Sequence, residues 1–552
     1  MKRTGADLLV ESLKKEGVEV IFGYPGGAIL PVYDELYRQE EIQHVLTVHE
    51  QGAAHAADGY ARASGRVGVC LATSGPGATN LITGLATAHM DSVPIVAITG
   101  QVSTGLMGKD SFQEVDITGM TLSISKHSFV VREVARIPQL VHEAFRIAAS
   151  GRPGVVILDI PRDMQTQEVE EEEVHPCFAT PPRSVNWPEA GLEAAAKALA
   201  AAKRPVVQVG GGAVRAGAAS QVRELARHLD APVVSTLMGL GVMPGDDSRF
   251  LGLTGMHGHK AANLAVHHAD LVLAIGCRFS DRFVTAKAEF IKGKTIVQLD
   301  IDPAEIGKNI PSHVGLTGNV GLLAQDLLEK VPKAERTDWW RQIQDWRANG
   351  KEKDEVLLDG PWIMKFLSAQ TQDQRTVFVT DVGQHQMWAA QHLTLRQPRT
   401  WLTSGGFGTM GFGMPAALGA QTACPEARVI HICGDGSFRM TGMELHTIAS
   451  TQAPVISIVL DNGSLGMVRQ WQELFFGGRC SSSILKEFDY VGMANALGVE
   501  GAVAQNRAEF TASFQRAWQE RKPFVLVAKV ESQQVRPMLK PGGQLNEFIE
   551  SM

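Results

Sequence analysis

The stretch Arg428-Val-Ile-His-Ile-Cys-Gly-Asp-Gly-Ser437 is the most informative segment of this 552-residue chain. Its apolar first half predicts a buried strand that runs directly into a Gly-Asp-Gly turn around Asp435. A second apolar run, residues 455–460, leads in the same way to Asn462. The spacing between Asp435 and Asn462 fits one strand, a crossover helix and a second, parallel strand. Both side chains are therefore expected at the same edge of a sheet.

These two strand ends carry the groups that a hard cation and a phosphate require. A carboxylate, an amide oxygen and a nearby main-chain oxygen suit Mg²⁺, which prefers oxygen ligands and shares those of a diphosphate. The glycines let main-chain N–H groups approach phosphate oxygens. The alternative is a plain strand-to-helix turn that is capped by an aspartate. The spaced Asn462 and the glycine-containing loop at 463–467 favour the binding site.

Short β-branched runs alternate with helical patterns along the chain, which predicts parallel sheets with right-handed crossovers. The expected fold class is α/β, with three doubly wound parallel-sheet domains. The expected strands are residues 18–22, 67–71, 94–99, 155–160, 205–209, 271–275, 295–299, 376–380, 428–433 and 455–460.

Two polar stretches interrupt this alternation and set the expected domain boundaries. The first holds an acidic run and four prolines, and the second is charged with interspersed tryptophans. Both are predicted to be linkers that lie over a surface. The predicted parts are an N-terminal domain at 1–165, a linker at 166–190, a central domain at 191–330, a linker at 331–361 and a C-terminal domain at 362–552.

The composition excludes several classes of protein. A net charge of -7 and 20% charged residues give no basic surface for nucleic acid. No stretch approaches the roughly 18 apolar residues of a membrane span, and the first residues do not have the pattern of a targeting peptide. The six cysteines have no C-x-x-C spacing, so neither a zinc site nor a disulfide framework is expected. A cytoplasmic location fits this cysteine usage.

A second candidate site lies near the N-terminus. Residues 45–50 are expected to form an apolar strand that ends in Glu50. Taken alone, such a glutamate is usually a helix cap or a surface residue. The loop Thr73-Ser-Gly-Pro-Gly-Ala-Thr-Asn80 also follows an expected strand and opens a helix. By itself that loop could bind an anion or merely turn the chain.

The Gly-Asp-Gly turn with Asn462 resembles the diphosphate motif of thiamine diphosphate enzymes, and residues 49–62 resemble their first-domain pattern. The resemblance implies Mg²⁺ ligands at Asp435, Asn462 and the main-chain oxygen of Ser464. It implies that Glu50 is the carboxyl group that activates the cofactor. The residues implied to contact thiamine diphosphate are Glu50, Gln384, His385, Met410, Gly434, Gly436, Ser437, Gly466 and Met467.

Met410 matches the bulky apolar residue that holds this cofactor in its bent shape, although a methionine more often fills a core. In this superfamily the cofactor lies between the first domain of one subunit and the third domain of another. The resemblance therefore implies a homodimer at least, or a tetramer.

Longer stretches resemble one family in particular, acetohydroxyacid synthase (acetolactate synthase). That family joins pyruvate to a second pyruvate or to 2-ketobutyrate, which gives 2-acetolactate or 2-aceto-2-hydroxybutyrate for branched-chain amino-acid synthesis. The stretches that carry the resemblance are residues 23–31, 100–102, 112–114, 151–154, 382–388, 467–471 and 535–538.

The resemblance implies catalytic roles for Glu50, Gln113 and Gly27, and substrate contacts by Arg282, Trp471 and Phe112. Arg282 matches an arginine that anchors the carboxylate of the second ketoacid, and a guanidinium can bind a carboxylate bidentately. Trp471 matches the residue that contacts the extra methyl group of 2-ketobutyrate. Taken alone, Arg282 would be a surface ion pair with its neighbouring aspartate, and Trp471 a core residue.

The central domain resembles the family's FAD-binding unit, in which the flavin is mainly structural. Read alone, Gly210-x-Gly212 is weak evidence for a dinucleotide, because position 215 is Arg instead of a third glycine. The residues implied to contact FAD are Arg152, Gly210, Gly211, Gly212, Thr236, Leu237, His257, Gly258, Arg278, Asp300 and Asn319.

Three positions depart from the family pattern: Ser103 stands where Pro is usual, Arg162 where Lys is usual, and Asn319 where Asp is common. Inhibitor response, ketoacid handling and flavin affinity depend on these positions. A small regulatory subunit is a further partner that the resemblance implies.

The alternative function is an FAD- and thiamine diphosphate-dependent pyruvate oxidase, followed by a flavin-free catabolic acetolactate synthase. A catalytically silent scaffold is disfavoured by intact Glu50, Asp435 and Asn462. A nicotinamide dehydrogenase lacks its complete glycine-rich loop.

Overall fold

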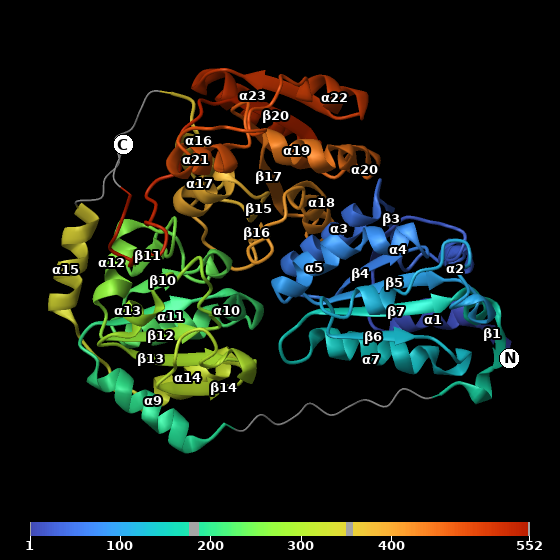
Figure 1. Ribbon diagram of the computed structural model, residues 1–552, viewed down its shortest axis with the longest axis horizontal. Coiled ribbons are helices and arrows are strands. Elements are labelled where there is room, and N and C mark those ends of the chain that lie inside the picture. The colour runs from blue at the N-terminus through green and yellow to red at the C-terminus, as the bar shows by residue number, and fades with distance from the viewer. Residues whose placement is uncertain (1, 176–186, 349–356, 550–552) are drawn as a thin grey trace. The chain divides into compact units, whose positions relative to one another are not determined.

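The computed structural model describes residues 2–175, 187–348 and 357–549. Within these ranges three six-stranded sheets carry the fold, each flanked by helices (Figure 1). The α/β class with three parallel-sheet domains is confirmed, and every strand expected from the sequence is present. The chain divides into two compact units. The first unit holds the N-terminal and C-terminal sheets, and the second holds the central sheet.

The N-terminal sheet has the strand order β3-β2-β4-β5-β7-β6, and its strands pair in parallel. Helices α1 and α7 pack on one face, and α3 and α5 pack on the other. The strands are β2 Val20–Gly23, β3 Gln43–Leu46, β4 Gly68–Ala72, β5 Ile95–Gln101, β6 His127–Val130 and β7 Val155–Pro161. The helices are α1 Gly5–Lys15, α2 Leu30–Tyr37, α3 Glu50–Ser64, α4 Pro76–Asn80, α5 Ile82–Met90, α6 Ile117–Met120, α7 Ile137–Ala149 and α8 Arg162–Thr166.

The C-terminal sheet has the order β16-β15-β17-β18-β20-β19. The chain leaves β15 in one direction along the sheet and β17 in the other, so the topological switch point, where ligands bind in such sheets, lies between these strands. The strands are β15 Thr376–Thr380, β16 Trp401–Thr403, β17 Arg428–Gly434, β18 Val455–Asp461, β19 Glu500–Ala504 and β20 Phe524–Lys529. The helices are α18 Gly413–Ala423, α19 Asp435–Thr441, α20 Leu445–Ser450, α21 Gly466–Phe475, α22 Tyr490–Ala496 and α23 Arg507–Glu520.

The central sheet forms the core of the second unit, with the order β11-β10-β9-β12-β13-β14. Apolar clusters cover both of its faces. The strands are β9 Pro205–Val209, β10 Val233–Ser235, β11 Phe250–Leu253, β12 Leu271–Ile275, β13 Thr295–Asp300 and β14 Val314–Thr317. The helices of this unit are α9 Glu189–Ala201, α10 Gly211–Arg215, α11 Ala219–His228, α12 Lys260–His268, α13 Lys287–Ile291, α14 Val320–Lys330, α15 Thr337–Ala348, α16 Gly360–Gln370 and α17 Gln384–His392.

Both predicted linkers contain ordered elements. In the first, Glu168–Glu170 forms strand β8, which pairs antiparallel with β1 Lys2–Thr4. Its prolines at 176, 181 and 182 lie outside the described residues. In the second, helix α15 packs on the central unit, where Trp339 is buried and its indole N–H donates to the carbonyl oxygen of Pro205 at 3.2 Å. The average composition of such an amphipathic helix is polar, although its tryptophans lie on the buried face. This polar average is why the sequence suggested a linker at 331–361.

Residues 384–401 and 530–549 also cluster with the central unit, although they fall within the stretch 362–552 that the sequence suggested as one domain. The exact domain boundaries stay a prediction.

Small residues bring the two sheets of the first unit together. Helices α3 and α18 lie between these sheets and share one apolar core. At Gly59, a Cβ atom would overlap the main chain of Ala416, and at Gly419 it would overlap the carbonyl oxygen of Ala56. The helices therefore approach to backbone contact, which only glycine permits at these two positions.

We predict that Gly419→Val lowers the free energy of unfolding by about 1–3 kcal/mol, because overpacking forces the two helices apart. Urea unfolding that is followed by circular dichroism measures the shift. The control is Gly105→Ala, where no atom lies within 4 Å of the added methyl group. Equal midpoints for Gly419→Val and the wild type would show that the helix contact tolerates a larger spacing.

Candidate active site

The two strand ends that the sequence suggested lie together at the carboxyl edge of the C-terminal sheet. The carboxylate of Asp435, directly after β17, accepts the main-chain N–H of Gly436 at 2.7 Å and that of Ser464 at 3.0 Å. The amide oxygen of Asn462, directly after β18, accepts the N–H of Ser464 at 3.2 Å and its hydroxyl at 3.0 Å. Asp435, Asn462 and Ser464 thus form one corner of oxygen donors.

Charge is concentrated at this corner. Burial, and to a smaller degree the neighbouring charge of Asp461, raise the pKa of Asp435 to about 7. The carboxylate of Asp461 points to Lys529, whose ammonium lies 2.5 Å away, so Asp461 is already paired. The corner around Asp435 offers oxygen ligands alone, which is the donor set that Mg²⁺ prefers.

The turn after Asp435 is closely packed and carries a buried hydroxyl group that has no partner in the described part of the chain. A Cβ atom at Gly436 would overlap the side chain of Leu465 and would lie 3.5 Å from the terminal methyl group of Met410. The hydroxyl oxygen of Ser437 is buried and has no hydrogen-bond partner among the described residues. Gly466 and Met467 begin helix α21 beside this corner. A buried hydroxyl in need of a partner and close main-chain N–H groups fit a diphosphate.

Glu50 is the first residue of helix α3, whereas the preceding strand β3 already ends at Leu46. The expectation that the strand runs through to Glu50 is therefore wrong, because His49 caps the helix by accepting the N–H of Gln51 at 3.1 Å. Glu50 is 9% exposed, and its carboxylate accepts the side-chain N–H of Asn80 at 2.9 Å. The loop that ends in Asn80 thus contacts Glu50 directly.

Other predicted residues gather at the same edge of the N-terminal sheet. A Cβ atom at Gly75 would lie 2.7 Å from the carbonyl oxygen of Gln113. The main chain of Gln113 has a positive φ of 58°. The hydroxyl of Thr73 accepts the main-chain N–H of Ala28 at 3.2 Å, next to Gly27. Phe112 is 88% exposed and therefore does not line a closed pocket within this chain.

Glu50 and Asp435 belong to the same compact unit, yet they lie in separate clusters. No hydrogen bond or ion pair joins them in the described part of the chain. The residue of the C-terminal sheet domain that contacts the start of α3 is Glu444, whose carboxylate accepts the N–H groups of Val48 and His49 at 3.2 Å. Sequence reasoning did not single out Glu444.

In the second unit, the FAD candidates lie at or after the carboxyl ends of all six strands of the central sheet. A Cβ atom at Gly210 would overlap the carbonyl oxygen of Gly276, and one at Gly212 would lie 2.7 Å from the Cα atom of Gly276. Thr236 and Leu237 adjoin this turn, since the N–H of Thr236 donates to the carbonyl oxygen of Val209 at 2.9 Å. Packing against Gly276 therefore explains two of the glycines without a ligand.

A second loop of this unit places His257 beside Arg282. Burial, and then the charge of Arg282, lower the pKa of His257 to about 4, so the imidazole is neutral at pH 7. Its Nδ1 atom is buried and has no hydrogen-bond partner among the described residues. Arg282 has a side chain that is 65% exposed, and it lies 4.0 Å from Asp281 and 3.8 Å from the sulfur of Met256.

The remaining FAD candidates have local structural contacts. Asn319 caps helix α14 and accepts the N–H of Gly321 at 2.9 Å. Asp300 is buried, and its carboxylate accepts the N–H of Asp302 at 3.0 Å. Gly258 closes a turn by donating its N–H to Gly255, and the carbonyl oxygen of Arg278 accepts from Asn309 at 2.9 Å. Arg152 lies in the first unit, where its guanidinium donates to the hydroxyl of Ser92 at 2.9 Å.

Gln384 and His385 begin helix α17 in the second unit, and the side chain of Gln384 donates to the carbonyl oxygen of Gln533 at 2.7 Å. Trp471 lies on α21 of the first unit, one turn after Met467, and its ring packs edge-on against Phe475 with centroids 5.5 Å apart.

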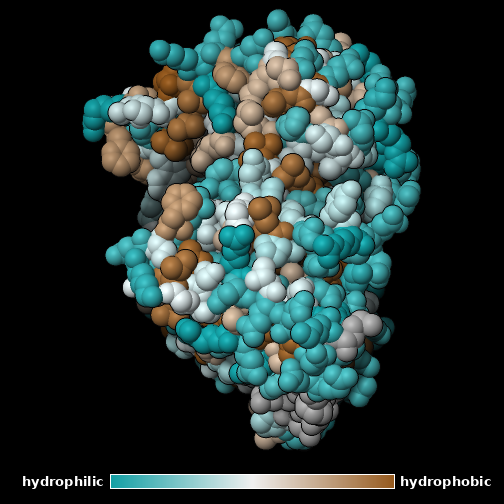
Figure 2. Space-filling view, turned by 90° about the vertical axis from the view of Figure 1, so that its right-hand side faces the viewer, coloured by the Kyte–Doolittle hydropathy of each residue, from teal (hydrophilic) through white to brown (hydrophobic). Residues whose placement is uncertain are grey.

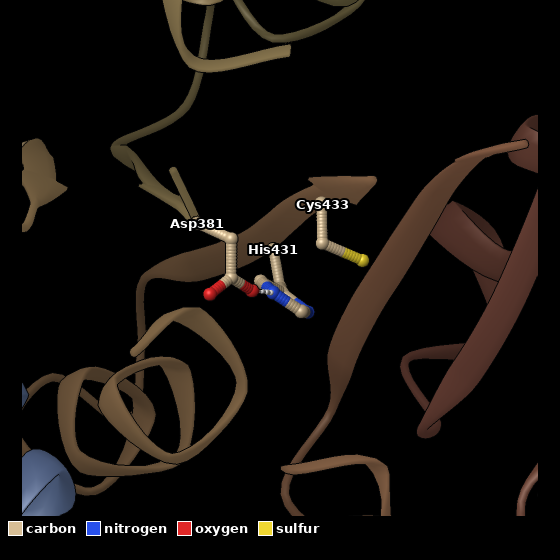
Figure 3. A group of neighbouring side chains, drawn as sticks. All are labelled: Asp381, His431 and Cys433. Carbon is tan, nitrogen blue, oxygen red and sulfur yellow. Dashed lines mark hydrogen bonds and ion pairs between the residues drawn. The ribbon is translucent and has the colours of Figure 1, made fainter. Parts of the chain in front are cut away.

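A buried cluster of three side chains, which the sequence did not indicate, lies where strands β15 and β17 of the C-terminal sheet end. Asp381, His431 and Cys433 have ligand atoms within 4.8 Å of one another (Figure 3). The carboxylate of Asp381, however, is already engaged by His431 at 2.9 Å and by the N–H groups of Gly411 and Gly413. The thiol of Cys433 donates to Ile458, and burial raises its pKa well above the usual range. These contacts describe a hydrogen-bond network in which Asp381 is saturated.

Asp381 follows strand β15 directly, as Asp435 follows β17. The strand-end signal that selected Asp435 could therefore have found Asp381 as well.

In the part of the chain that the structure describes, no helix is long and apolar enough to cross a membrane.

Comparison with known proteins finds three matching family models. The model of the N-terminal TPP binding domain of thiamine pyrophosphate enzymes matches residues 3–120, that of the central domain matches 192–327, and that of the C-terminal TPP binding domain matches 381–528.

Similar proteins extend over nearly the whole chain. The acetolactate synthase isozyme 2 large subunit of Escherichia coli is 44% identical over 99% of this chain and 100% of its own length. A probable acetolactate synthase large subunit of Methanocaldococcus jannaschii is 43% identical over 99% of this chain and 95% of its own. The acetolactate synthase large subunit of Haemophilus influenzae is 41% identical over 100% and 98%. The chain therefore belongs to the acetolactate synthase large-subunit family of thiamine pyrophosphate enzymes.

Proposed function

We propose that this chain catalyses the acetolactate synthase reaction, in which pyruvate is decarboxylated and its two-carbon unit is joined to a second 2-ketoacid. The observation that carries the proposal is the oxygen-donor corner of Asp435, Asn462 and Ser464, which opens beside Ser437 and Met410 at the switch point of the C-terminal sheet. The products are 2-acetolactate from pyruvate and 2-aceto-2-hydroxybutyrate from 2-ketobutyrate. Family membership favours this reaction over that of a pyruvate oxidase.

The corner residues would hold Mg²⁺ through the carboxylate of Asp435, the amide oxygen of Asn462 and the main-chain oxygen of Ser464. The unpaired hydroxyl of Ser437 and the N–H groups around Gly436 would receive the diphosphate. Thiamine diphosphate, when bound, supplies the electron sink for decarboxylation of the ketoacid. The protein's part is to position the cofactor, to move one proton and to exclude water.

Glu50 is the proposed proton donor to the cofactor. Its carboxylate is nearly buried and held by Asn80 on one side, so its direction is fixed. Gly77 lets the main chain approach the second carboxylate oxygen closely, because a Cβ atom there would lie 3.1 Å from it. A carboxyl group with one oxygen occupied and one accessible can donate a proton to a ring nitrogen.

A second copy of the chain is proposed to complete the site. Glu50 and the corner at Asp435 are not in contact within one chain. Large apolar side chains near both clusters in the sequence are exposed: Leu46, Phe112, Met440 and Met443. Figure 2 shows small brown groups of hydrophobic side chains among teal and white ones on the face that it draws. Apolar residues exposed in this way support a subunit interface, and hence a dimer or a tetramer of dimeric units.

Arg282 is the proposed anchor for the carboxylate of the second ketoacid, and Trp471 the proposed contact for its alkyl group. The side chain of Arg282 is 65% exposed, and a guanidinium can bind a carboxylate bidentately. Gly27 and Gln113 are proposed as further catalytic residues, and Phe112 as a further substrate contact.

FAD is proposed as a structural cofactor of the second unit. The buried, unpaired Nδ1 atom of neutral His257 supports a ligand at this edge of the central sheet. The capping role of Asn319 shows that its side chain already serves α14. A small regulatory subunit and a cytoplasmic location remain predictions from the sequence.

We predict that Glu50→Gln lowers kcat by about 10²–10⁴-fold, because the amide keeps the shape but cannot donate the proton. Acetolactate formation from pyruvate with added thiamine diphosphate, Mg²⁺ and FAD measures the change. The control is Glu40→Gln, which alters an exposed glutamate of the same domain. Wild-type turnover in Glu50→Gln would remove Glu50 from the reaction.

Asp435→Asn should weaken Mg²⁺-dependent binding of thiamine diphosphate by roughly 10- to 100-fold, since the charged oxygen ligand is lost while a hydrogen-bond acceptor remains. Quenching of tryptophan fluorescence during cofactor titration, with and without Mg²⁺, measures the affinity. Asp34→Asn, on the exposed face of α2, serves as the matched control. Unchanged affinity would mean that another site holds the metal.

The variants Arg282→Ala and Trp471→Leu should separate binding of the second ketoacid's carboxylate from the choice between 2-ketobutyrate and pyruvate. In Arg282→Ala, loss of the guanidinium should raise the activation free energy by about 1.5–3 kcal/mol, which lowers the rate of product formation by one to two decades. Trp471→Leu should lower the preference for 2-ketobutyrate over pyruvate by about 10-fold or more, with total turnover less affected. A competition assay with both ketoacids measures both effects, and Lys287→Ala is the control for a surface cation. A product ratio unchanged by Trp471→Leu would make Trp471 a structural residue.

A further inference from the structure

The segment 403–413 connects β16 to α18 and carries Met410 at its centre. Its middle is exposed: Phe407 is 50% exposed, and Gly406 and Gly408 are also at the surface. Gly408 and Gly411 have positive φ angles of 70° and 86°. A glycine-rich segment of this kind has a large conformational freedom when it is not held, so its contacts decide where Met410 lies.

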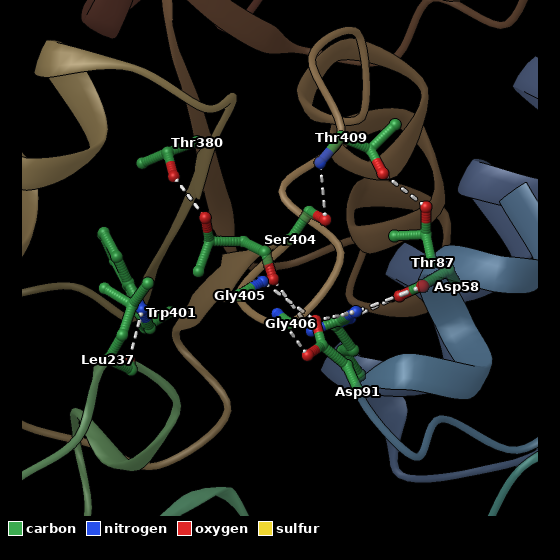
Figure 4. A network of polar contacts seen from close by, with 12 residues as sticks. Asp58, Thr87, Asp91, Leu237, Thr380, Trp401, Ser404, Gly405, Gly406 and Thr409 are labelled. Atoms are coloured by element: carbon green, nitrogen blue, oxygen red, sulfur yellow. Dashed lines mark hydrogen bonds and ion pairs between the residues drawn. The ribbon is translucent and has the colours of Figure 1, made fainter. Parts of the chain in front are cut away.

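The first end of the segment is held by Asp91, at the end of α5 (Figure 4). Its carboxylate accepts the N–H of Gly406 at 2.8 Å with one oxygen, and the N–H of Gly405 at 3.0 Å with the other. The guanidinium of Arg62, on α3, lies 3.0 Å from the second oxygen and donates to the carbonyl oxygen of Thr403 at 2.9 Å. Both oxygens of Asp91 therefore act as acceptors.

Arg62 is itself buried between two carboxylates, those of Asp58 and Asp91. Its guanidinium also lies over the ring of Phe412, 5.2 Å from the centroid. Two further hydroxyl contacts support this end: Thr87 with Thr409 at 2.6 Å, and Ser404 with the N–H of Thr409 at 2.9 Å. Figure 4 shows Thr87 of α5 pointing toward Thr409, and Asp91 pointing toward Gly405 and Gly406.

The second end of the segment is held by Asp381. One of its carboxylate oxygens accepts the N–H of Gly411 at 2.7 Å and that of Gly413 at 3.1 Å. The other oxygen faces Nε2 of His431 at 2.9 Å, and Nδ1 of this imidazole lies 3.2 Å from the hydroxyl of Ser457. Since a carboxylate can only accept, Nε2 of His431 donates to it.

The fit at this end leaves no space. A Cβ atom at Gly413 would lie 2.5 Å from Nε2 of His431 and 2.6 Å from the carboxylate of Asp381. Asp381 and His431 are both fully buried. A buried carboxylate is expensive to place in a protein unless it is fully hydrogen-bonded, so this arrangement strongly fixes the main chain that satisfies it.

We propose that Asp91 and Asp381 are positioning residues that clamp the two ends of segment 403–413 and thereby fix Met410 against Gly436. The inference rests on the proposed function, in which Met410 contacts thiamine diphosphate. Met410 lies between the two clamped ends, and its methyl group is 3.5 Å from where a Cβ atom of Gly436 would be. The first clamp comes from the N-terminal sheet domain, so it also ties the helix that begins with Glu50 to the segment that carries Met410.

The two clamps differ in what an Asn substitution should do. In Asp91→Asn, the amide N–H₂ must face either a main-chain N–H or the guanidinium of Arg62, so one contact becomes repulsive. In Asp381→Asn, the amide oxygen can still accept from Gly411 and Gly413, and the amide N–H₂ can donate to His431 once its tautomer changes. Asp91→Asn should therefore release the first end of segment 403–413. At the second end, Asp381→Asn should keep the segment held, whereas Asp381→Ala should release it.

The experiment uses the full-length protein without added cofactor and follows hydrogen–deuterium exchange by mass spectrometry in peptides that cover 403–413. Asp91→Asn and Asp381→Ala should speed exchange about tenfold or more, because each loses at least one hydrogen bond to a charged acceptor. Chymotrypsin should also cleave faster at Phe407. The control is Asp159→Asn, a buried carboxylate of the same unit whose partners are Thr99 and Gln101. It should leave exchange in this segment unchanged.

The same variants are then titrated with thiamine diphosphate and Mg²⁺. Asp91→Asn and Asp381→Ala should weaken cofactor binding about tenfold or more, and Asp381→Asn should stay within about twofold of the wild type. If Asp381→Ala does not fold, Gly413→Ala replaces it, since its methyl group displaces the Asp381–His431 pair. Wild-type exchange and cofactor affinity in Asp91→Asn and in the second variant would overturn the clamp. A wild-type protein that binds no thiamine diphosphate would instead overturn the proposed function.

Discussion

Buried carboxylates that accept main-chain N–H groups at the ends of parallel strands are the constraint on which the rest of this structure depends. Asp381 and Asp435 each follow a strand of the C-terminal sheet, on the two sides of its switch point. Each carboxylate has lost water and regains hydrogen bonds from loops that come from elsewhere in the sequence. Since leaving either group unsatisfied would be costly, the loops adopt the conformations that supply these donors.

The difference between the two carboxylates lies in how completely they are satisfied. Asp381 receives two main-chain N–H groups and a histidine, and a Cβ atom at Gly413 would not fit beside it. Asp435 receives two N–H groups and lies beside the amide oxygen of Asn462, near a buried serine hydroxyl that has no partner. The first arrangement is closed and holds the chain. The second keeps coordination capacity for a cation and its phosphate ligands.

The sequence predicted the strands and the meeting of Asp435 with Asn462 at one sheet edge, because both signals are local. An apolar run followed by Gly-Asp-Gly specifies a strand end, and the spacing to Asn462 specifies its neighbour. It failed at Glu50, where the strand stops at Leu46 because His49 caps a helix. It also missed Asp381, which follows a strand as Asp435 does and which the strand-end signal could have found. It missed Asp91 and Glu444 because their partners are main-chain N–H groups far away in the chain. Main-chain donors have no residue identity, so no sequence pattern reports them.

The separation of Glu50 from Asp435 follows from how the first unit is built. Helix α3 begins with Glu50 and packs on α18 through Gly59 and Gly419, which leaves no space between the two sheets for a ligand at this contact. The start of α3 is held by Glu444, so Glu50 cannot swing towards the metal corner without breaking those hydrogen bonds. In the proposed function, Glu50 and the corner at Asp435 act on one cofactor, and since no hydrogen bond or ion pair joins them within the described residues of one chain, a second copy is expected to supply the missing half. The same close packing that stabilises the unit is therefore the physical reason to expect an enzyme that works as an oligomer.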